Sequence, residues 1–177
     1  PNEKYYNEVV ELGKAISLCG YTICNGGYYG TMEAASKGVN ENGGKAIGVT
    51  VDAWETIPNN YNSEIVKMPN LSERLMELVT FGDAYLVLRG GSGTLIEIAT
   101  TLELMNKGLM REKLMVFYLD FWKSLLDTLK LDSLRLKEII LQNVKFVQTP
   151  NEMSEVLNNY FKEETYRTGK NLKNIKY

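Results

Sequence analysis

The most informative absence in this 177-residue chain is histidine, of which there is none. A Ser-His-Asp triad, a Cys-His dyad and a histidine-ligated metal site are therefore excluded. Acid–base chemistry has to come from Asp, Glu, Lys, Tyr or Arg. Cysteine is scarce as well: Cys19 and Cys24 are too few for a disulfide framework or a structural zinc site, and they fit a packing role in a reducing compartment.

Long apolar runs and an excess of positive charge are also absent. No run approaches the length of a membrane span and no signal peptide is visible, so we expect a cytoplasmic protein without a membrane partner. The formal net charge is −2, which gives nucleic-acid binding no overall electrostatic support.

What the sequence does contain is a glycine-rich turn between a predicted strand over residues 84–88 and a predicted helix over residues 94–107. Glycines remove side chains so that backbone N–H groups can approach an anion, and a helix N-terminus adds the positive end of its dipole. The pattern is neither a Walker loop nor the dinucleotide G-x-G-x-x-G. We predict a phosphate site formed by Arg89, Gly90, Gly91, Ser92, Gly93 and Thr94.

A second turn of the same kind lies upstream. A predicted strand over residues 21–25 leads into a glycine-rich segment, and a predicted helix over residues 31–37 follows. Ligands of open α/β sheets bind outside the carboxyl ends of the strands, where both turns are expected to lie. Two such turns favour a nucleotide or sugar-phosphate pocket, to which this turn would contribute Gly26, Gly27, Gly30 and Met32.

Strands and helices alternate along the rest of the chain, which predicts an α/β fold: a Rossmann-like, doubly wound parallel sheet in three α/β/α layers. We expect a single domain over residues 1–161 and a polar, lysine-rich tail over 162–177 that is mobile or an oligomer arm. The chain opens at Pro1 in a helix, whereas such a sheet normally opens with a strand, so the first strand is expected to be missing from this fragment. Further helices are predicted over 3–19, 71–81, 121–130, 133–142 and 151–161, further strands over 46–51, 114–118 and 144–147, and a connection over 52–66.

Glu97 and Arg74 are the candidate catalytic residues. On the helix after the second turn, Glu97 could orient water or steady an oxocarbenium-like centre. The helical spacing puts Thr94 and Thr101 on the same face as Glu97. The opposite face is expected to turn an apolar stripe to the core, formed by Leu95, Ile98, Ala99, Leu102 and Met105. Thr94 and Glu97 also have the spacing of a capping box, which needs no ligand. Arg74 could act on a ligand or form a surface pair with Glu77. Arg89 could contact a phosphate or point to solvent.

These positions resemble a Rossmann-like family that includes the Lonely Guy-type cytokinin-activating enzymes, whose members were long mislabelled as lysine decarboxylases. That family carries Pro-Gly-Gly-x-Gly-Thr-x-x-Glu, which residues 89–97 match at all but the proline. Arg74 stands where the family has an arginine on the preceding helix. Residues 26–32 are similar to its other turn, Gly-Gly-x-x-Gly-x-Met. The likeness runs from residue 5 to about residue 160.

The resemblance implies an enzyme that hydrolyses the N-glycosidic bond of a nucleoside 5′-monophosphate to free base and ribose 5-phosphate. The two glycine turns would hold the phosphate, Glu97 would orient water at C1′, and Arg74 would stabilise the departing base or the developing charge. The reaction needs no cofactor or metal, and the family is typically homodimeric.

Departures from the family pattern keep a second hypothesis open. Family enzymes usually have Met-His-x-Arg-Lys around the arginine, whereas residues 71–75 read Leu-Ser-Glu-Arg-Leu; Arg89 also replaces the proline. The alternative is a non-catalytic protein that binds or carries a nucleotide or a molybdenum cofactor. A lysine decarboxylase is rejected, because pyridoxal phosphate is held as a lysine Schiff base and neither glycine turn contains a lysine.

Overall fold

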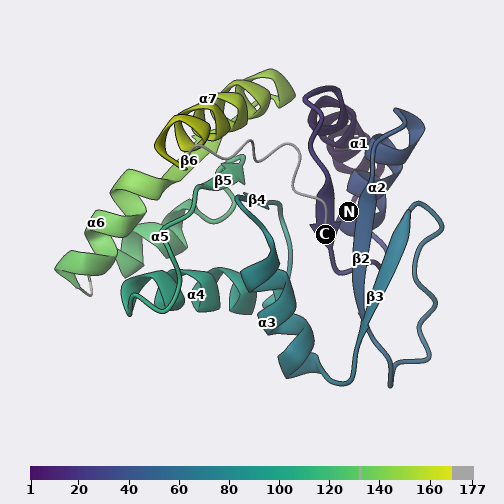
Figure 1. The fold of residues 1–177 in the computed structure, drawn as a ribbon, viewed down its shortest axis with the longest axis horizontal. Helices are drawn as coiled ribbons and strands as arrows, with labels where there is room; N and C mark the ends of the chain where they lie inside the picture. Colours follow the sequence, from purple (N-terminus) through teal and green to yellow (C-terminus); the bar gives the residue numbers. More distant parts are fainter. Residues whose placement is uncertain (132, 169–177) are drawn as a thin grey trace. The chain divides into compact units, whose positions relative to one another are not determined.

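The computed structural model describes residues 1–131 and 133–168. By their contacts these residues form two compact units. The first comprises residues 1–74 and the described residues from 150 onward, and the second comprises residues 75–149. Each unit contains one three-stranded parallel sheet with helices packed beside it (Figure 1).

In the first unit the strand order is β1-β2-β3, and both pairings are parallel. The central strand, β2, is buried along its whole length, which explains its unbroken apolar sequence. β3 is an edge strand with charged, exposed positions. The elements are α1 (Glu3–Leu18), β1 (Ile23–Asn25), α2 (Thr31–Glu41), β2 (Ala46–Val51), β3 (Glu64–Met68) and α7 (Pro150–Thr168), together with the start of α3 (Leu71–Phe81).

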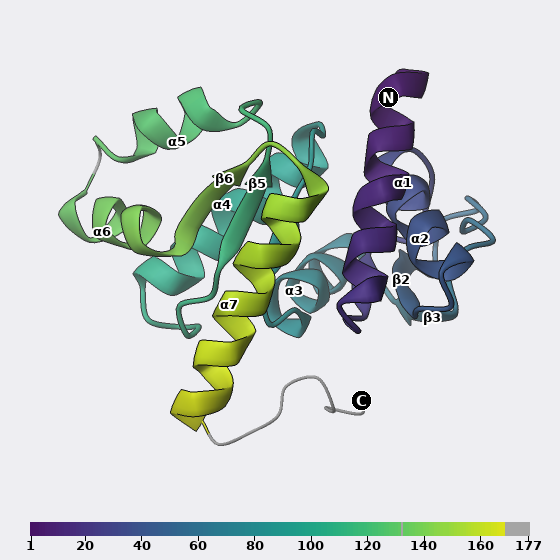
Figure 2. The same cartoon turned by 90° about the horizontal axis from the view of Figure 1, so that it is seen from above.

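Helices α1 and α2 lie side by side in this unit (Figure 2), and glycine sets how closely they approach. A Cβ on Gly38 of α2 would lie 2.0 Å from the backbone oxygen of Val10, and a Cβ on Gly13 of α1 would lie 2.4 Å from that of Ala35. Such distances are impossible for real carbon atoms, so only glycine permits this backbone-to-backbone contact.

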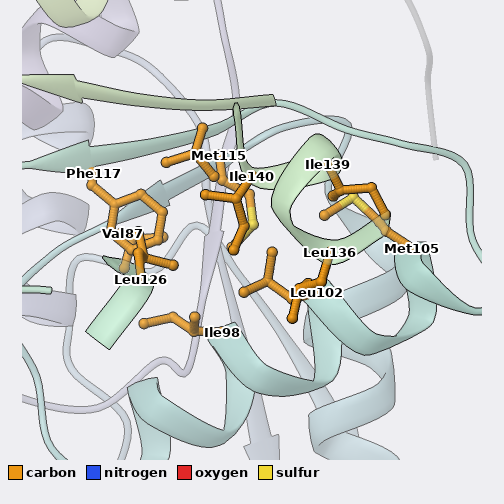
Figure 3. Close-up of a cluster of buried hydrophobic side chains, with 11 residues drawn as sticks. Val87, Ile98, Leu102, Met105, Met115, Phe117, Leu126, Leu136, Ile139 and Ile140 are labelled. Atoms are coloured by element: carbon orange, nitrogen blue, oxygen red, sulfur yellow. The ribbon is translucent and has the colours of Figure 1, made fainter. Parts of the chain in front are cut away.

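The second unit has the strand order β4-β5-β6, again with parallel pairings. Its core joins the strands to three helices. Val87 and Phe117 on the strands pack with Ile98 of α4, Leu126 of α5 and Ile140 of α6 (Figure 3). The elements are the end of α3, β4 (Tyr85–Val87), α4 (Ser92–Asn106), β5 (Met115–Tyr118), α5 (Lys123–Leu129), α6 (Leu134–Asn143) and β6 (Val144–Val147).

The predicted α/β class is confirmed, because both sheets are parallel and helices join all their successive strands except β2 and β3. The described strands form two three-stranded sheets where one doubly wound sheet was predicted. Several element bounds also differ from the prediction: α2, for example, continues to Glu41 rather than ending at residue 37. Residues 64–66 begin β3 rather than belonging to a connection, because an exposed edge strand has no apolar run to signal it. Helix α7 continues to Thr168, so residues 162–168 are helical. Helix α4 begins at Ser92, ahead of the predicted Thr94.

Among the described residues, no helix combines the length and the apolar character that crossing a lipid bilayer requires. The remainder of the predicted tail, with Lys170, Lys173 and Lys176, lies outside the described residues.

Candidate functional site

The second glycine turn delivers the N-terminus of α4 to the carboxyl end of β4. The N-cap residue is Gly91, which offers no capping side chain, and the first helical hydrogen bond runs from the Leu95 N–H to the Gly91 carbonyl. The N–H groups of residues 92–94 therefore have no acceptor within the helix. None of them has a hydrogen-bond partner elsewhere among the described residues. Free N–H groups at a helix N-terminus are suited to bind an anion.

The three glycines of this turn differ in how much space surrounds them. A Cβ on Gly90 would lie 2.0 Å from Oγ1 of Thr94, so the Thr94 side chain already fills that space. Around Gly91 and Gly93 a Cβ would meet nothing within 4 Å, and neither residue has a positive φ. Neither the backbone nor the surrounding protein requires glycine at these two exposed positions. What they leave is open space in front of the helix N-terminus.

Glu97 lies in the second turn of α4, since no acidic residue occurs in the first. This position removes the capping-box interpretation, because the capping residue is Gly91 and Thr94 is already inside the helix. The Glu97 side chain is half-buried.

The face that α4 turns toward the core was only partly predicted. Ile98, Leu102 and Met105 are buried as expected. Thr101 is buried with them rather than sharing an exposed face with Glu97. Leu95 and Ala99, expected in the core, are exposed. The earlier start of the helix does not change its periodicity. Fewer of the apolar side chains of α4 are buried in the core of this unit than the apolar pattern indicates.

Residues after β5 hold the approach to this turn. The indole Nε1 of Trp122 donates to the carbonyl oxygen of Leu88, at 2.9 Å, immediately before Arg89. Leu119, directly after β5, has a φ of 63°, a left-handed conformation that is costly for a residue with a side chain. The sequence argument missed both residues, and the aromatic pair Phe121–Trp122 at a strand end was the available signal. Arg89 itself is exposed.

In the first turn, by contrast, either the backbone conformation or a neighbouring side chain explains each glycine. Gly27 and Gly30 each have a φ of 75°, which favours glycine. A Cβ on Gly26 would lie 2.0 Å from Nη2 of Arg74 and 2.7 Å from Sδ of Met32. Gly26 and Gly27 are buried. That they contact a phosphate, as Met32 and Gly30 were also predicted to do, stays a prediction.

Arg74 is built into this first turn. Its Nε donates to the carbonyl oxygen of Val49 at 2.8 Å, and its Nη2 donates to that of Gly26 at 3.2 Å. The guanidinium carbon also lies 5.7 Å from the ring centres of Tyr28 and Trp54. Within the described residues it forms no ion pair, so the predicted alternative of a surface pair with Glu77 is wrong. The result is a half-buried positive charge without a neutralising carboxylate.

Asparagine side chains tie the first turn to the following loop. Asn59 and Asn62 both donate from Nδ2 to the carbonyl oxygen of Gly27, at 3.0 and 2.9 Å. Asn25 accepts from the Gly27 N–H at 2.8 Å and donates to the Met32 carbonyl. The sequence argument missed these residues, although the asparagine-rich stretch around residues 59–62 was a visible signal. They fix the backbone of the turn on both sides.

No cluster of three or more His, Cys, Asp or Glu residues that could hold a metal ion occurs among the residues the structure describes. One lysine is deeply buried: Lys113, which is 5% exposed. Its ammonium donates to the carbonyl oxygens of Thr80 and Gly82 at 3.0 and 2.6 Å, and burial, with a smaller contribution from Arg111, lowers its pKa. Lys113 and Gly82 precede β5 and β4, so this lysine lies at the amino ends of the strands, opposite the glycine turn.

Comparison with known proteins places the chain in a family. The family described as "Possible lysine decarboxylase" matches residues 32–159, which include Arg74 and the whole second turn. The chain belongs to this family.

Among curated relatives of this family member is the cytokinin riboside 5′-monophosphate phosphoribohydrolase LOG of rice (Oryza sativa subsp. japonica). It is 29% identical over 111 residues, covering 61% of this chain and 46% of the rice protein. The chain thus spans about half the length of that relative. The predicted resemblance to the Lonely Guy-type family is confirmed at this level of identity.

Solved structures support the same fold. A structural-genomics target determined by X-ray crystallography has a TM-score of 0.73 and 26% identity, covering 90% of each chain. The molybdenum cofactor carrier protein of Chlamydomonas reinhardtii has a TM-score of 0.72 and 20% identity, covering 90% of this chain and 89% of the other. The solved structures with this fold thus include a protein named as a carrier, and the curated relatives by sequence include a protein named as an enzyme.

Proposed function

We propose that this family member hydrolyses the N-glycosidic bond of a nucleoside 5′-monophosphate, releasing the free base and ribose 5-phosphate. The observation that carries the proposal is the second glycine turn. It combines helix N–H groups that have no partner among the described residues, open space at Gly91 and Gly93, and a carboxylate, Glu97, further along the same helix. The named activity of the rice relative supports this assignment.

In this reaction the bond between C1′ and the base nitrogen breaks, and a water oxygen bonds to C1′. Charge develops on the ribose as an oxocarbenium-like centre, which a nearby carboxylate stabilises. We assign to Glu97 the orientation of that water and the acceptance of its proton, while the departing base nitrogen takes up a proton. Arg74 would stabilise the negative charge that develops on the base, consistent with its positive charge lacking a carboxylate partner among the described residues.

The family description names a lysine decarboxylase, and the residues of this chain do not fit its cofactor. Pyridoxal phosphate forms a Schiff base with a lysine that is accessible at the active site. The buried lysine, Lys113, is committed to two backbone carbonyls at the amino ends of the strands. Neither glycine turn contains a lysine.

A carrier of a nucleotide or of the molybdenum cofactor is the second candidate, and one contact favours it. Arg74 hydrogen-bonds two backbone carbonyls of its own chain, so its presence is explained without catalysis. The same fold also serves a protein named as a molybdenum cofactor carrier. The choice between enzyme and carrier therefore depends on Glu97, whose capping role the helix boundary removes.

The deciding experiment follows the release of ribose 5-phosphate from AMP and from isopentenyladenosine monophosphate by the full chain. Glu97→Gln is compared with Glu103→Gln, an exposed carboxylate on the same helix that pairs with Lys107. We expect turnover to fall at least about 100-fold in Glu97→Gln, the usual scale for losing a general base, and to stay unchanged in Glu103→Gln. Binding without turnover in all three proteins would establish the carrier instead.

We also propose that the protein acts as a homodimer, as the family resemblance implies. Helix α4 exposes Leu95, Ile96 and Ala99, apolar side chains that an interface would cover. Light scattering coupled to size exclusion gives the answer directly: a monomer at micromolar concentration would contradict the proposal.

A further inference from the structure

Three side chains of the first unit form a compact cluster at the carboxyl ends of β1 and β2. The ring centres of Tyr28 and Trp54 are 5.5 Å apart, and the guanidinium carbon of Arg74 is 5.7 Å from each. The three nearly equal distances describe a triangle. Arg74 therefore lies beside both rings and is not enclosed between them, so the indole keeps a face that neither partner covers.

The backbone of Trp54 is tied to the end of β2. Trp54 follows β2 in a tight turn, in which its N–H donates to the carbonyl oxygen of Val51. The Val51 N–H in turn donates to the hydroxyl oxygen of Tyr28, at 3.2 Å. One residue at the end of the strand thus holds the backbone of Trp54 and the side chain of Tyr28. A segment held in this way loses less conformational entropy when a ligand binds than a free loop does.

Exposure separates the two rings. Tyr28 is 7% exposed and acts as the floor of the cluster, whereas Trp54 is 44% exposed. Tyr28 by itself already supplies a buried ring next to the guanidinium, so packing does not explain a second, partly exposed indole. Planar bases stack on open aromatic faces, and a cation beside the ring strengthens such sites.

The guanidinium of Arg74 is also held in a fixed orientation. Its Nε and Nη2 are held by the carbonyls of Val49 and Gly26, which fixes its plane. Its Nη1 has no hydrogen-bond partner among the described residues. An Nη1 donor next to the open indole can bond to a ring nitrogen or oxygen of a base stacked there.

We propose that Trp54 is the residue on which the base of the ligand stacks, with Arg74 recognising the edge of that base. This inference rests on the proposed function, in which the ligand is a nucleoside 5′-monophosphate. It adds a specificity determinant: a planar bicyclic base is held by Trp54, and a sugar phosphate without a base gains nothing from it.

The test measures binding of AMP and of ribose 5-phosphate to the full chain and to Trp54→Ala, Trp54→Phe and Tyr29→Ala. Tyr29 is the control, because it is an exposed aromatic residue next to Tyr28 in the first glycine turn. We expect Trp54→Ala to weaken AMP binding about tenfold or more, as loss of a base–aromatic stack does, and to leave ribose 5-phosphate binding unchanged. Trp54→Phe keeps a ring and should lie in between, and Tyr29→Ala should match the unchanged protein.

Tryptophan fluorescence gives an independent readout, since the chain has two tryptophans and Trp122 is hydrogen-bonded in the second unit. AMP should quench the emission of the unchanged protein, ribose 5-phosphate should not, and the AMP-dependent quenching should disappear in Trp54→Phe. Equal losses of AMP and ribose 5-phosphate affinity in Trp54→Ala would mean that Trp54 only supports Arg74, which overturns the inference.

The two proposals fail in different ways. If AMP is bound and cleaved but Trp54→Ala binds it normally, the stacking inference falls and the proposed function stands. If AMP is bound through Trp54 without being cleaved, stacking stands and hydrolysis falls. If the unchanged protein binds neither AMP nor ribose 5-phosphate, both are overturned.

Discussion

In the first glycine turn, Gly26 makes room for Arg74, and Gly27 and Gly30 adopt a positive φ. In the second turn, Gly91 and Gly93 have neither a conformational nor a packing reason to be glycine. The two turns look alike in the sequence, yet one is buried and filled by its own protein while the other opens onto free space. The comparison teaches that a glycine-rich turn leaves space beside its backbone. Only the tertiary structure shows whether a side chain of the protein already fills that space or whether it is open to a ligand.

The largest expected effect is on the first turn. In Gly27→Ala a residue with a side chain would have to adopt a left-handed backbone conformation. Its Cβ would lie 3.0 Å from the Cα of Gly48. We expect the free energy of unfolding, measured with urea, to fall by about 2 to 4 kcal/mol, combining backbone strain with overpacking. The control is Gly43→Ala, which has a φ of 74° and no atom within 4 Å of the added carbon. Equal losses in the two variants would show that crowding does not contribute.

The next effect concerns Arg74, which ties the first turn to β2. Arg74→Met would leave the carbonyl oxygens of Val49 and Gly26 without this donor. We expect a loss of about 1 to 3 kcal/mol in the free energy of unfolding, the cost of unsatisfied half-buried acceptors. Arg111→Met serves as control, because Arg111 pairs with Asp83 at the surface and such pairs contribute about 0 to 1 kcal/mol. A loss no larger than that of the control would contradict a structural role for Arg74.

The second turn should respond in the opposite way. Gly91→Ala adds a carbon that meets no protein atom, so the free energy of unfolding should change by less than about 0.5 kcal/mol. Affinity for AMP should fall about tenfold, because the added methyl group would occupy space assigned to the phosphate. Calorimetric titration of both proteins measures the difference. Unchanged affinity would contradict the comparison between the two turns, because the ligand would then not use the open space beside Gly91.

The smallest effect is a pH dependence in the segment that leads to the first turn. Tyr21 donates to Oδ1 of Asn158 at 2.7 Å, and burial, with a contribution from Cys19, raises its pKa to about 12. Because the folded pKa lies above the ordinary value near 10, the contribution of Tyr21 is complete below pH 10 and is lost as the pH rises through 12. The stability advantage over Tyr21→Phe should therefore shrink between pH 10 and 12. An advantage that stays constant would show that Tyr21 titrates normally in the fold.

The sequence by itself determined the α/β class and the location of both turns. Unbroken apolar runs predicted the buried strands β2 and β5, because strands covered on both faces carry no alternation. Helical periodicity predicted α1 and α3 to within a residue or two. The motif around Glu97 was enough to indicate the family, since its chemistry is concentrated in one contiguous stretch.

Tertiary structure alone decided what each glycine and each charged residue does. Arg74 donates to the carbonyl oxygen of Gly26 across 48 residues of sequence, and Asn62 donates to that of Gly27 across 35 residues. No local pattern encodes such partners. The start of α4 was misplaced for a related reason, because Gly91 caps the helix without a side chain and leaves no capping signal. Periodicity is a property of neighbours along the chain, whereas hydrogen-bond partners, open space and the exposure of Trp54 depend on segments that only folding brings together.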